Sequence, residues 1–148
     1  ACNPESTSYL QRSCPLSLWR QLFELANIQW FSLQKGTPAQ ALAEMAAGNP
    51  NVIDLSEKLD DFADTAALIE QLDLVISIDT SVAHLAGALD IPTWLLLPFD
   101  NEWRWLQRRS DSPWYPSMRL FRQPLPGQWP LLIERVCQAL TNGQPFLR

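Results

Sequence analysis

The sequence of 148 residues lacks the features that mark several large classes of protein. No apolar run approaches the roughly eighteen residues needed to span a bilayer, and the N-terminus has no signal-peptide pattern. Lys and Arg number 11 against 16 Asp and Glu, and the net charge of −5 argues against nucleic acid or an anionic membrane as a general partner. A local pocket on an acidic protein can still be positive, so a phosphorylated ligand is not excluded.

Cysteine is scarce and forms no metal-site pattern. Cys2, Cys14 and Cys137 are widely spaced and odd in number, which indicates reduced thiols in a cytoplasmic protein. The sequence also has no carboxylate cluster, no Asp-x-Asp pair and no Gly-x-Gly-x-x-Gly, so we expect neither a metal nor a dinucleotide cofactor. His84 is the single histidine, and any imidazole chemistry must therefore use it.

Periodicity, caps and breakers predict a regular alternation of helices and strands. Helices are expected over residues 15–26, 38–47, 65–71, 81–89 and 129–140. The helix that contains residues 65–71 is expected to start near Phe62. Strands are expected over residues 28–33, 51–55, 74–78, 93–97 and 119–121. Thr37 is expected to cap the second helix, with Pro38 at its first position. Among the strands, residues 74–78 are expected to be the most buried.

Alternation with short links is typical of an α/β, Rossmann-like fold, in which a parallel sheet carries helices on both faces in three layers. The length and a hydrophobic fraction of 47% fit a single domain over residues 1–148. Ligands of such sheets bind at the carboxyl ends of the strands, near the point where strand order reverses. The loops after Leu33, Leu55, Ile78 and Leu97 all fall at that edge.

The run from Leu74 to Leu89 passes from a buried strand directly into a helix at Asp79-Thr80-Ser81. These are preferred N-cap residue types. The free amides and the positive dipole end of such a helix favour an anion, phosphate above all, and His84 adds a donor near the first turn. The residues by themselves also fit a simpler interpretation, in which Asp79 and Thr80 only cap the helix and His84 lies at the surface.

The same run, followed by Ile91-Pro92, resembles the nucleotide-sugar motif of heptosyltransferase-like glycosyltransferases, especially bacterial members with tetratricopeptide repeats upstream. Other segments that read like this family follow in the family's order: 31–36, 61–69, 94–99, 103–106 and 112–117. The resemblance implies a GT-B enzyme of two Rossmann-like halves, with this chain as the C-terminal, donor-binding half. Ala1-Cys2-Asn3-Pro4 reads like the loop after that half's first strand, which the sequence does not contain.

The resemblance also assigns candidate donor-binding residues. It implies that the donor diphosphate binds the amides of Thr80 and Ser81 and that Asp79 faces the sugar hydroxyls. His84 then either bonds a phosphate oxygen or supports Asp79. Lys35 follows a buried strand and can reach the diphosphate as a point charge, but it also fits a solvated turn lysine.

Phe62, Asp64 and Thr65 would lie near the nucleoside. The alternative is a capping pattern in which Asp61 or Asp64 caps a helix and Phe62 belongs to the core, and for Phe62 we favour the core. The aromatic segments 103–105 and 114–115 could stack on a sugar or base, or form a partner interface. We favour a structural role in which these rings pack over the sheet edge.

The first loop departs from the family's pattern. The family usually carries His, Lys and Asp there, whereas this chain has Glu5-Ser6-Thr7-Ser8-Tyr9-Leu10-Gln11, and only Arg12-Ser13 matches. Cys2 and Asp90 stand where the family tends to have glycine. A basic residue in that loop would help to neutralise the leaving diphosphate, so its loss weakens the case for catalysis.

The resulting prediction is the nucleotide-diphosphate-sugar-binding domain of a larger two-domain cytoplasmic glycosyltransferase. By resemblance, the intact enzyme transfers the sugar of a nucleotide sugar to an acceptor hydroxyl on a protein or glycan and releases nucleoside diphosphate, without metal or cofactor. Its catalytic base and its further partners, the N-terminal half and tetratricopeptide repeats, lie elsewhere in the protein, so the isolated chain is expected to bind the donor weakly and transfer nothing. The alternative is a degenerate, non-catalytic nucleotide-binding or scaffold domain.

Overall fold

The computed structural model describes residues 12–143, and the expectations for residues 1–11, including Cys2 and the first loop, lie outside this range. Helices and strands alternate along the described chain as predicted. In chain order the elements are α2 (Leu16–Phe23), β1 (Trp30–Ser32), α3 (Thr37–Ala46), β2 (Val52–Asp54), the 3-10 turn η1 (Ser56–Lys58), α4 (Phe62–Ile69), β3 (Val75–Ile78), α5 (Ser81–Ala88), β4 (Thr93–Leu97), the 3-10 turn η2 (Trp103–Trp105), β5 (Met118–Arg122) and α6 (Trp129–Thr141).

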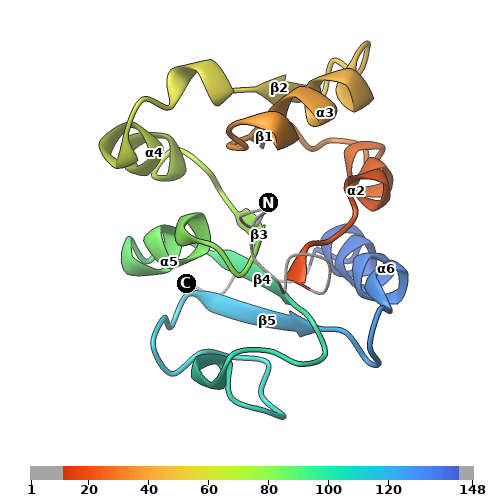
Figure 1. Cartoon of the computed structure of the whole chain (residues 1–148), viewed down its shortest axis with the longest axis vertical. Coiled ribbons are helices and arrows are strands. Elements are labelled where there is room, and N and C mark those ends of the chain that lie inside the picture. Colours follow the sequence, from red (N-terminus) through yellow and green to blue (C-terminus); the bar gives the residue numbers. More distant parts are fainter. Residues whose placement is uncertain (1–11, 144–148) are drawn as a thin grey trace.

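All paired strands among these elements run parallel, which confirms the α/β class. They form two ladders instead of one continuous sheet (Figure 1). β1 pairs with β2, and Trp30 lies opposite Val52. The other ladder has the order β3-β4-β5, in which Thr93 of β4 lies between Val75 and Met118.

Helices cover both faces of the three-stranded ladder. Trp94 and Leu96 of β4 face a hydrophobic cluster that includes Leu22 of α2 and Leu132 of α6. The alternate residues Leu95 and Leu97 belong to a second cluster on the opposite face, together with Ala83 of α5 and Trp105. This alternation is the period of two that a strand imposes. In Figure 1, α2 and α6 lie on the right and α4 and α5 on the left.

β4 is the most buried strand, and the prediction that residues 74–78 would be so is wrong. All five residues of β4 are buried, whereas Ile76 and Ser77 of β3 are only partly buried. Both strands are apolar in sequence, but β4 is central in its ladder and β3 lies at its edge. Burying a large apolar side chain contributes roughly 1.5–3 kcal/mol, so the core is centred on β4.

The start of α3 also differs from the prediction. Gly36 occupies the N-cap position with φ of 71°, and Thr37 and Pro38 are the first two helical residues. Glycine suits this site because a positive φ is strained for other residues. Proline is tolerated in the first turn because its missing N–H would have no helical partner there. Among the described residues, no helix has the length and apolar character needed to cross a membrane.

Candidate functional site

The sequence places a buried carboxylate and a helix N-terminus side by side where β3 ends. Asp79 follows the last residue of β3 and is 7% exposed. Thr80 is the N-cap of α5, in extended conformation, and its side chain makes no capping bond. Its Oγ1 instead lies 3.1 Å from Ser77 Oγ. Within residues 12–143 no side chain caps the first turn of α5, so the interpretation in which Asp79 and Thr80 only cap the helix is wrong.

The side chains of Arg12 and His84 hold the Asp79 carboxylate. Arg12 Nη2 donates to Asp79 Oδ2 over 3.1 Å, and His84 Nε2 lies 3.4 Å from Asp79 Oδ1. The other ring nitrogen, Nδ1 of His84, is 3.0 Å from the Tyr115 hydroxyl. The His84 ring also stacks on Trp105, with 5.3 Å between ring centroids. His84 is thus fixed from three sides, in the position from which it supports Asp79.

A pocket of about 330 Å³ opens beside Asp79, and acidic side chains outnumber basic ones in its lining. Asp79, Asp100 and Glu102 contribute carboxylates, and Arg12 is the one cation among the described lining residues. Arg12 Nη1 also approaches Glu102 Oε1 at 3.7 Å. Carboxylates accept hydrogen bonds from hydroxyl groups but repel phosphate. The pocket therefore fits a polyhydroxylated group better than an anion.

Lys35 lies on the other ladder, after β1. Its ammonium group donates to the Leu59 carbonyl, not to a residue of the β3–α5 junction. The loops after β1 and β3 both leave the carboxyl ends of parallel strands, as expected. The structure nevertheless brings together only Asp79, Thr80, Ser81 and His84 of the predicted residues, and a role for Lys35 at the diphosphate stays a prediction.

Asp64 and Thr65 make hydrogen bonds that stabilise the start of α4. Asp61 is the N-cap and accepts from Ala63 N at 2.7 Å and Asp64 N at 3.0 Å. Asp64 Oδ2 accepts in return from the Asp61 amide at 3.3 Å, which completes a capping box. Thr65 is buried and donates to the Asp61 carbonyl over 2.9 Å. The capping alternative is thus confirmed, whereas a role at the nucleoside stays a prediction.

Phe62 does not belong to the core, contrary to our expectation. Its side chain is 60% exposed, although it is the first residue of α4. The capping box fixes the start of the helix, and the buried positions of α4 are Thr65 and Ile69. By spacing Phe62 shares the helix face of Thr65 and Ile69, but it is the first residue of α4 and its ring stays outside the core.

The aromatic segments divide between core and surface. Trp105 is fully buried, whereas Trp103 and Trp114 are 72% and 55% exposed. Trp114 Nε1 donates to the Arg104 carbonyl over 2.8 Å, which fixes the ring at the surface. Trp103, Arg104 and Trp114 line a groove of about 410 Å³ with His84 and Tyr115. A packed, structural role is therefore confirmed for Trp105, which shares a cluster with Leu95 on a face of the sheet and not over its edge. For the exposed Trp103 and Trp114 the expected packing is wrong.

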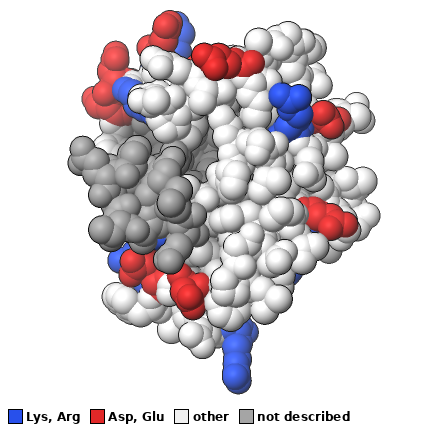
Figure 2. Space-filling view, turned by 45° about the vertical axis from the view of Figure 1, so that its right-hand side comes forward, with Lys and Arg blue, Asp and Glu red and all other residues white. Residues whose placement is uncertain are grey.

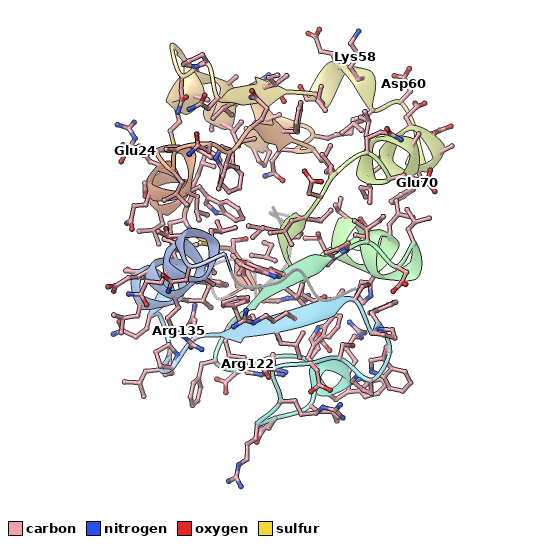
Figure 3. All side chains as sticks on the ribbon, turned by 180° about the vertical axis from the view of Figure 1, so that it is seen from behind. Glu24, Lys58, Asp60, Glu70, Arg122 and Arg135 are labelled. Atoms are coloured by element: carbon pink, nitrogen blue, oxygen red, sulfur yellow. The ribbon has the colours of Figure 1, made fainter. Side chains whose placement is uncertain are left out.

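Arg122 positions the loop that carries this groove and the acidic pocket. Its Nη1 donates to Asn101 Oδ1 over 2.6 Å, its Nε to the Arg109 carbonyl over 3.2 Å and its Nη2 to the Trp105 carbonyl. Burial lowers the pKa of Arg122 from its ordinary value. Figure 3 labels Arg122 on β5, next to this loop. No local pattern in the sequence singled out this residue.

Arg12 and Tyr115 were also missed as members of the site. Arg12 is 67 residues from Asp79 in the chain, so only the folded chain brings them into contact. A signal for Arg12 did exist, because Arg12-Ser13 is the part of the first loop that matches the pattern of the resembled family. On the face that Figure 2 shows, charged side chains are scattered and form no patch of one sign.

Comparison with known proteins gives two matches. Residues 6–97 match the model of a family described as Glycosyltransferase family 9 (heptosyltransferase), and this range contains the β3–α5 junction. The chain is also 32% identical over 135 residues to Protein FlbA of Caulobacter vibrioides, an alignment that covers 86% of this chain and 22% of FlbA. The chain thus spans about a fifth of the length of this relative. No solved structure matches the chain significantly.

Proposed function

Because the chain belongs to glycosyltransferase family 9 (heptosyltransferase), we propose that it is the part of a glycosyltransferase that binds a nucleotide-diphosphate sugar. In this proposal an acceptor hydroxyl attacks the anomeric carbon of the bound sugar, the glycosidic bond to the diphosphate breaks, and nucleoside diphosphate leaves. The observation that carries the proposal is the β3–α5 junction, where an uncapped helix N-terminus adjoins a buried carboxylate held by Arg12 and His84.

The geometry supports different places for the diphosphate and the sugar. The diphosphate lies at the amides of Thr80 and Ser81, since free donors and the helix dipole both favour an anion there. The sugar lies in the acidic pocket, where Asp79, Asp100 and Glu102 accept from its hydroxyls. The opposite placement would set the diphosphate against three carboxylates, so electrostatic repulsion argues against it.

Arg12 and Lys35 supply the positive charge in this proposal. Arg12 already neutralises part of the Asp79 charge and lines the pocket, and a guanidinium there can also bond a phosphate oxygen. Lys35 exchanges its bond to the Leu59 carbonyl for the leaving diphosphate. The first turn of α4, with Asp64 and Thr65, faces the nucleoside. Stabilisation of the leaving group then comes from the helix dipole and these two cations, with no metal required.

The remaining components are supplied by other parts of the full protein. We propose an acceptor on a protein or glycan, and a general base from an N-terminal half that faces this domain across a cleft. Tetratricopeptide repeats in the same protein and a cytoplasmic location complete the proposal. The acidic pocket lining favours one further candidate, a domain that kept the fold but binds no donor, because three carboxylates oppose a single arginine there.

The test is a calorimetric titration with UDP, ADP, GDP and dTDP on the unaltered chain and two variants of one residue. Ser81→Pro removes the first amide of α5 but keeps the helix, since proline is tolerated at the first helical position. Ser81→Ala keeps the amide and removes only the hydroxyl. Loss of one hydrogen bond to a charged group predicts roughly 10-fold or greater weakening for Ser81→Pro. Equal affinities of the two variants, or no binding by a folded chain, would refute this site.

A further inference from the structure

The connection between β4 and β5 forms most of the aromatic groove, which has no role in the proposed function. Trp103, Arg104, Trp114 and Tyr115 of this connection line the groove together with His84 of α5. In Figure 1 the connection forms the lower end of the molecule. No carboxylate is among the described residues that line the groove, so its chemistry differs from that of the acidic pocket next to it.

Hydrogen bonds hold the exposed rings of the groove in place. Besides the bond from Trp114 Nε1 to the Arg104 carbonyl, the backbone amides of Trp114 and Tyr115 donate to Ser112 Oγ over 3.2 and 3.3 Å. The Ser112 side chain is buried. The Arg104 guanidinium lies 6.0 Å from the centre of the Trp103 ring. Both indoles are thus ordered although more than half of each is exposed, and fixed apolar surface of this kind is typical of a binding site.

The size and lining of the groove fit a small ligand. Its volume of about 410 Å³ lies in the range of roughly 300–1,000 Å³ that is common for ligand clefts. Such clefts combine aromatic walls with a few polar groups, and His84 and Arg104 supply polar groups here. Behind the lining lies the buried Trp105 ring, 5.3 Å from the His84 ring and 6.3 Å from the Tyr115 ring. The walls of the groove are therefore supported by the core.

Trp103 and His84 connect the groove to the acidic pocket. Trp103 lines both cavities. His84 lines the groove, and its Nε2 lies 3.4 Å from Asp79 Oδ1 in the pocket. A ligand in the groove therefore adjoins the group that occupies the pocket. Since the proposed function places the donor sugar in the pocket, the groove lies where the acceptor approaches that sugar.

A sugar ring matches the chemistry of both cavities. A pyranose has C–H groups on its faces, which pack on aromatic rings such as Trp103 and Trp114. The hydroxyls at its rim can bond to His84 and Arg104, and those that reach the acidic pocket can donate to Glu102. A nucleobase also stacks on an indole, but its phosphates would then meet the carboxylates of the adjoining pocket. The combination favours a sugar.

We propose that the aromatic groove binds a sugar ring of the acceptor, stacked on Trp103 and Trp114. The acceptor is accordingly a glycan and not an unmodified protein side chain. Binding of a sugar in the groove is inferred from the groove itself, whereas its role as the acceptor rests on the proposed function.

The test follows the indole N–H signals of the isotope-labelled 148-residue chain by NMR. Methyl glycosides of glucose, galactose, mannose and N-acetylglucosamine are added separately, and sorbitol is the control because it has hydroxyls but no ring. At least one glycoside is expected to shift the signals of Trp103 and Trp114, whereas sorbitol shifts neither. The signal of Trp129, which is buried in the cluster on the other face of the ladder, is expected to stay unchanged and reports that the fold is kept.

Two variants then locate the binding site. Trp103→Ala removes an exposed ring and is expected to weaken glycoside binding roughly fivefold or more. Leu131→Ala is the matched control, because this exposed apolar side chain of α6 lines neither cavity, and it is expected to leave the affinity unchanged.

Several results would overturn the proposal. One is that no glycoside shifts the Trp103 and Trp114 signals more than sorbitol does, and another is that Trp103→Ala binds as tightly as the unaltered chain. Shifts with uridine or adenosine but with no glycoside would identify a nucleobase site. Shifts that follow protein concentration alone would identify a contact between two copies of the chain.

The glycoside titration contains no nucleotide, so its outcome is separate from that of the nucleotide titration. Glycoside binding without nucleotide binding would overturn the proposed function and leave the sugar site in the groove. Nucleotide binding without glycoside binding would leave the proposed function and overturn the sugar site.

Discussion

Gly87 lies under the Tyr115 ring, and replacing it with alanine tests the packing that holds His84. A Cβ at this position would lie 2.6 Å from Tyr115 Cγ and 3.0 Å from Tyr115 Cβ. Because the ring and its attachment point are both too close, rotation of the side chain cannot remove the overlap. The Tyr115 hydroxyl is also tied to His84 Nδ1 at 3.0 Å. The segment carrying Tyr115 must therefore move away from α5.

The expected cost combines two opposing terms. Overpacking of this kind costs about 1–3 kcal/mol. Alanine is better than glycine in a helix by about 1 kcal/mol, and Gly87 lies inside α5. The net loss for Gly87→Ala is then up to about 2 kcal/mol, or roughly 4 °C in Tm for each kcal/mol in a chain of this size.

A double-mutant cycle measured by thermal and urea unfolding separates the two terms. In a Tyr115→Gly background the ring and its Cβ are both absent and the overlap is removed, so Gly87→Ala is expected to stabilise the protein by up to about 1 kcal/mol. The sign of the effect thus reverses between the two backgrounds. If Gly87→Ala destabilised both backgrounds equally, contact with Tyr115 would not be the cause and the reasoning would be wrong.

Three further predictions concern single residues. Asp61→Ala removes the N-cap of α4 and is expected to lower the free energy of unfolding by about 1 kcal/mol, whereas the neighbouring Asp60→Ala leaves it nearly unchanged in urea titrations. Arg122→Met leaves the Asn101 side chain without its partner and is expected to cost about 1–3 kcal/mol in the same assay. Burial raises the pKa of Cys14 from 9.0 to about 12, so the neutral thiol contributes stability below pH 9 that is lost as the pH rises toward 12. Iodoacetamide at pH 9 should therefore modify Cys14 at least about tenfold more slowly in the folded chain than in guanidinium, and equal rates would contradict burial of the thiol.

Local patterns predicted most of the secondary structure. The bounds of β4 coincide with the apolar run 93–97, and α5 begins at Ser81 as expected. Helix starts and buried strands depend on residues close together in the chain, through caps and side-chain periodicity. The start of α3 was the exception, since Gly36 uses a positive φ and no side-chain cap.

The candidate site was predicted only in part for the same reason. Asp79, Thr80, Ser81 and His84 belong to one continuous run, so the sequence could identify them together. The partners that hold them could not be identified in that way. Arg12 lies 67 residues from Asp79, and Tyr115 lies 31 residues from His84.

The sequence by itself determined the order of helices and strands, the α/β class and the resemblance to family 9, because each of these depends on patterns within short runs of residues. Only the tertiary structure decided that the strands form two ladders, that β4 rather than β3 is central, and that Arg12, Asp79, His84 and Tyr115 form one chain of contacts. Pairing and burial depend on which distant segments meet, and that depends on the free energy of the whole fold rather than on any local preference.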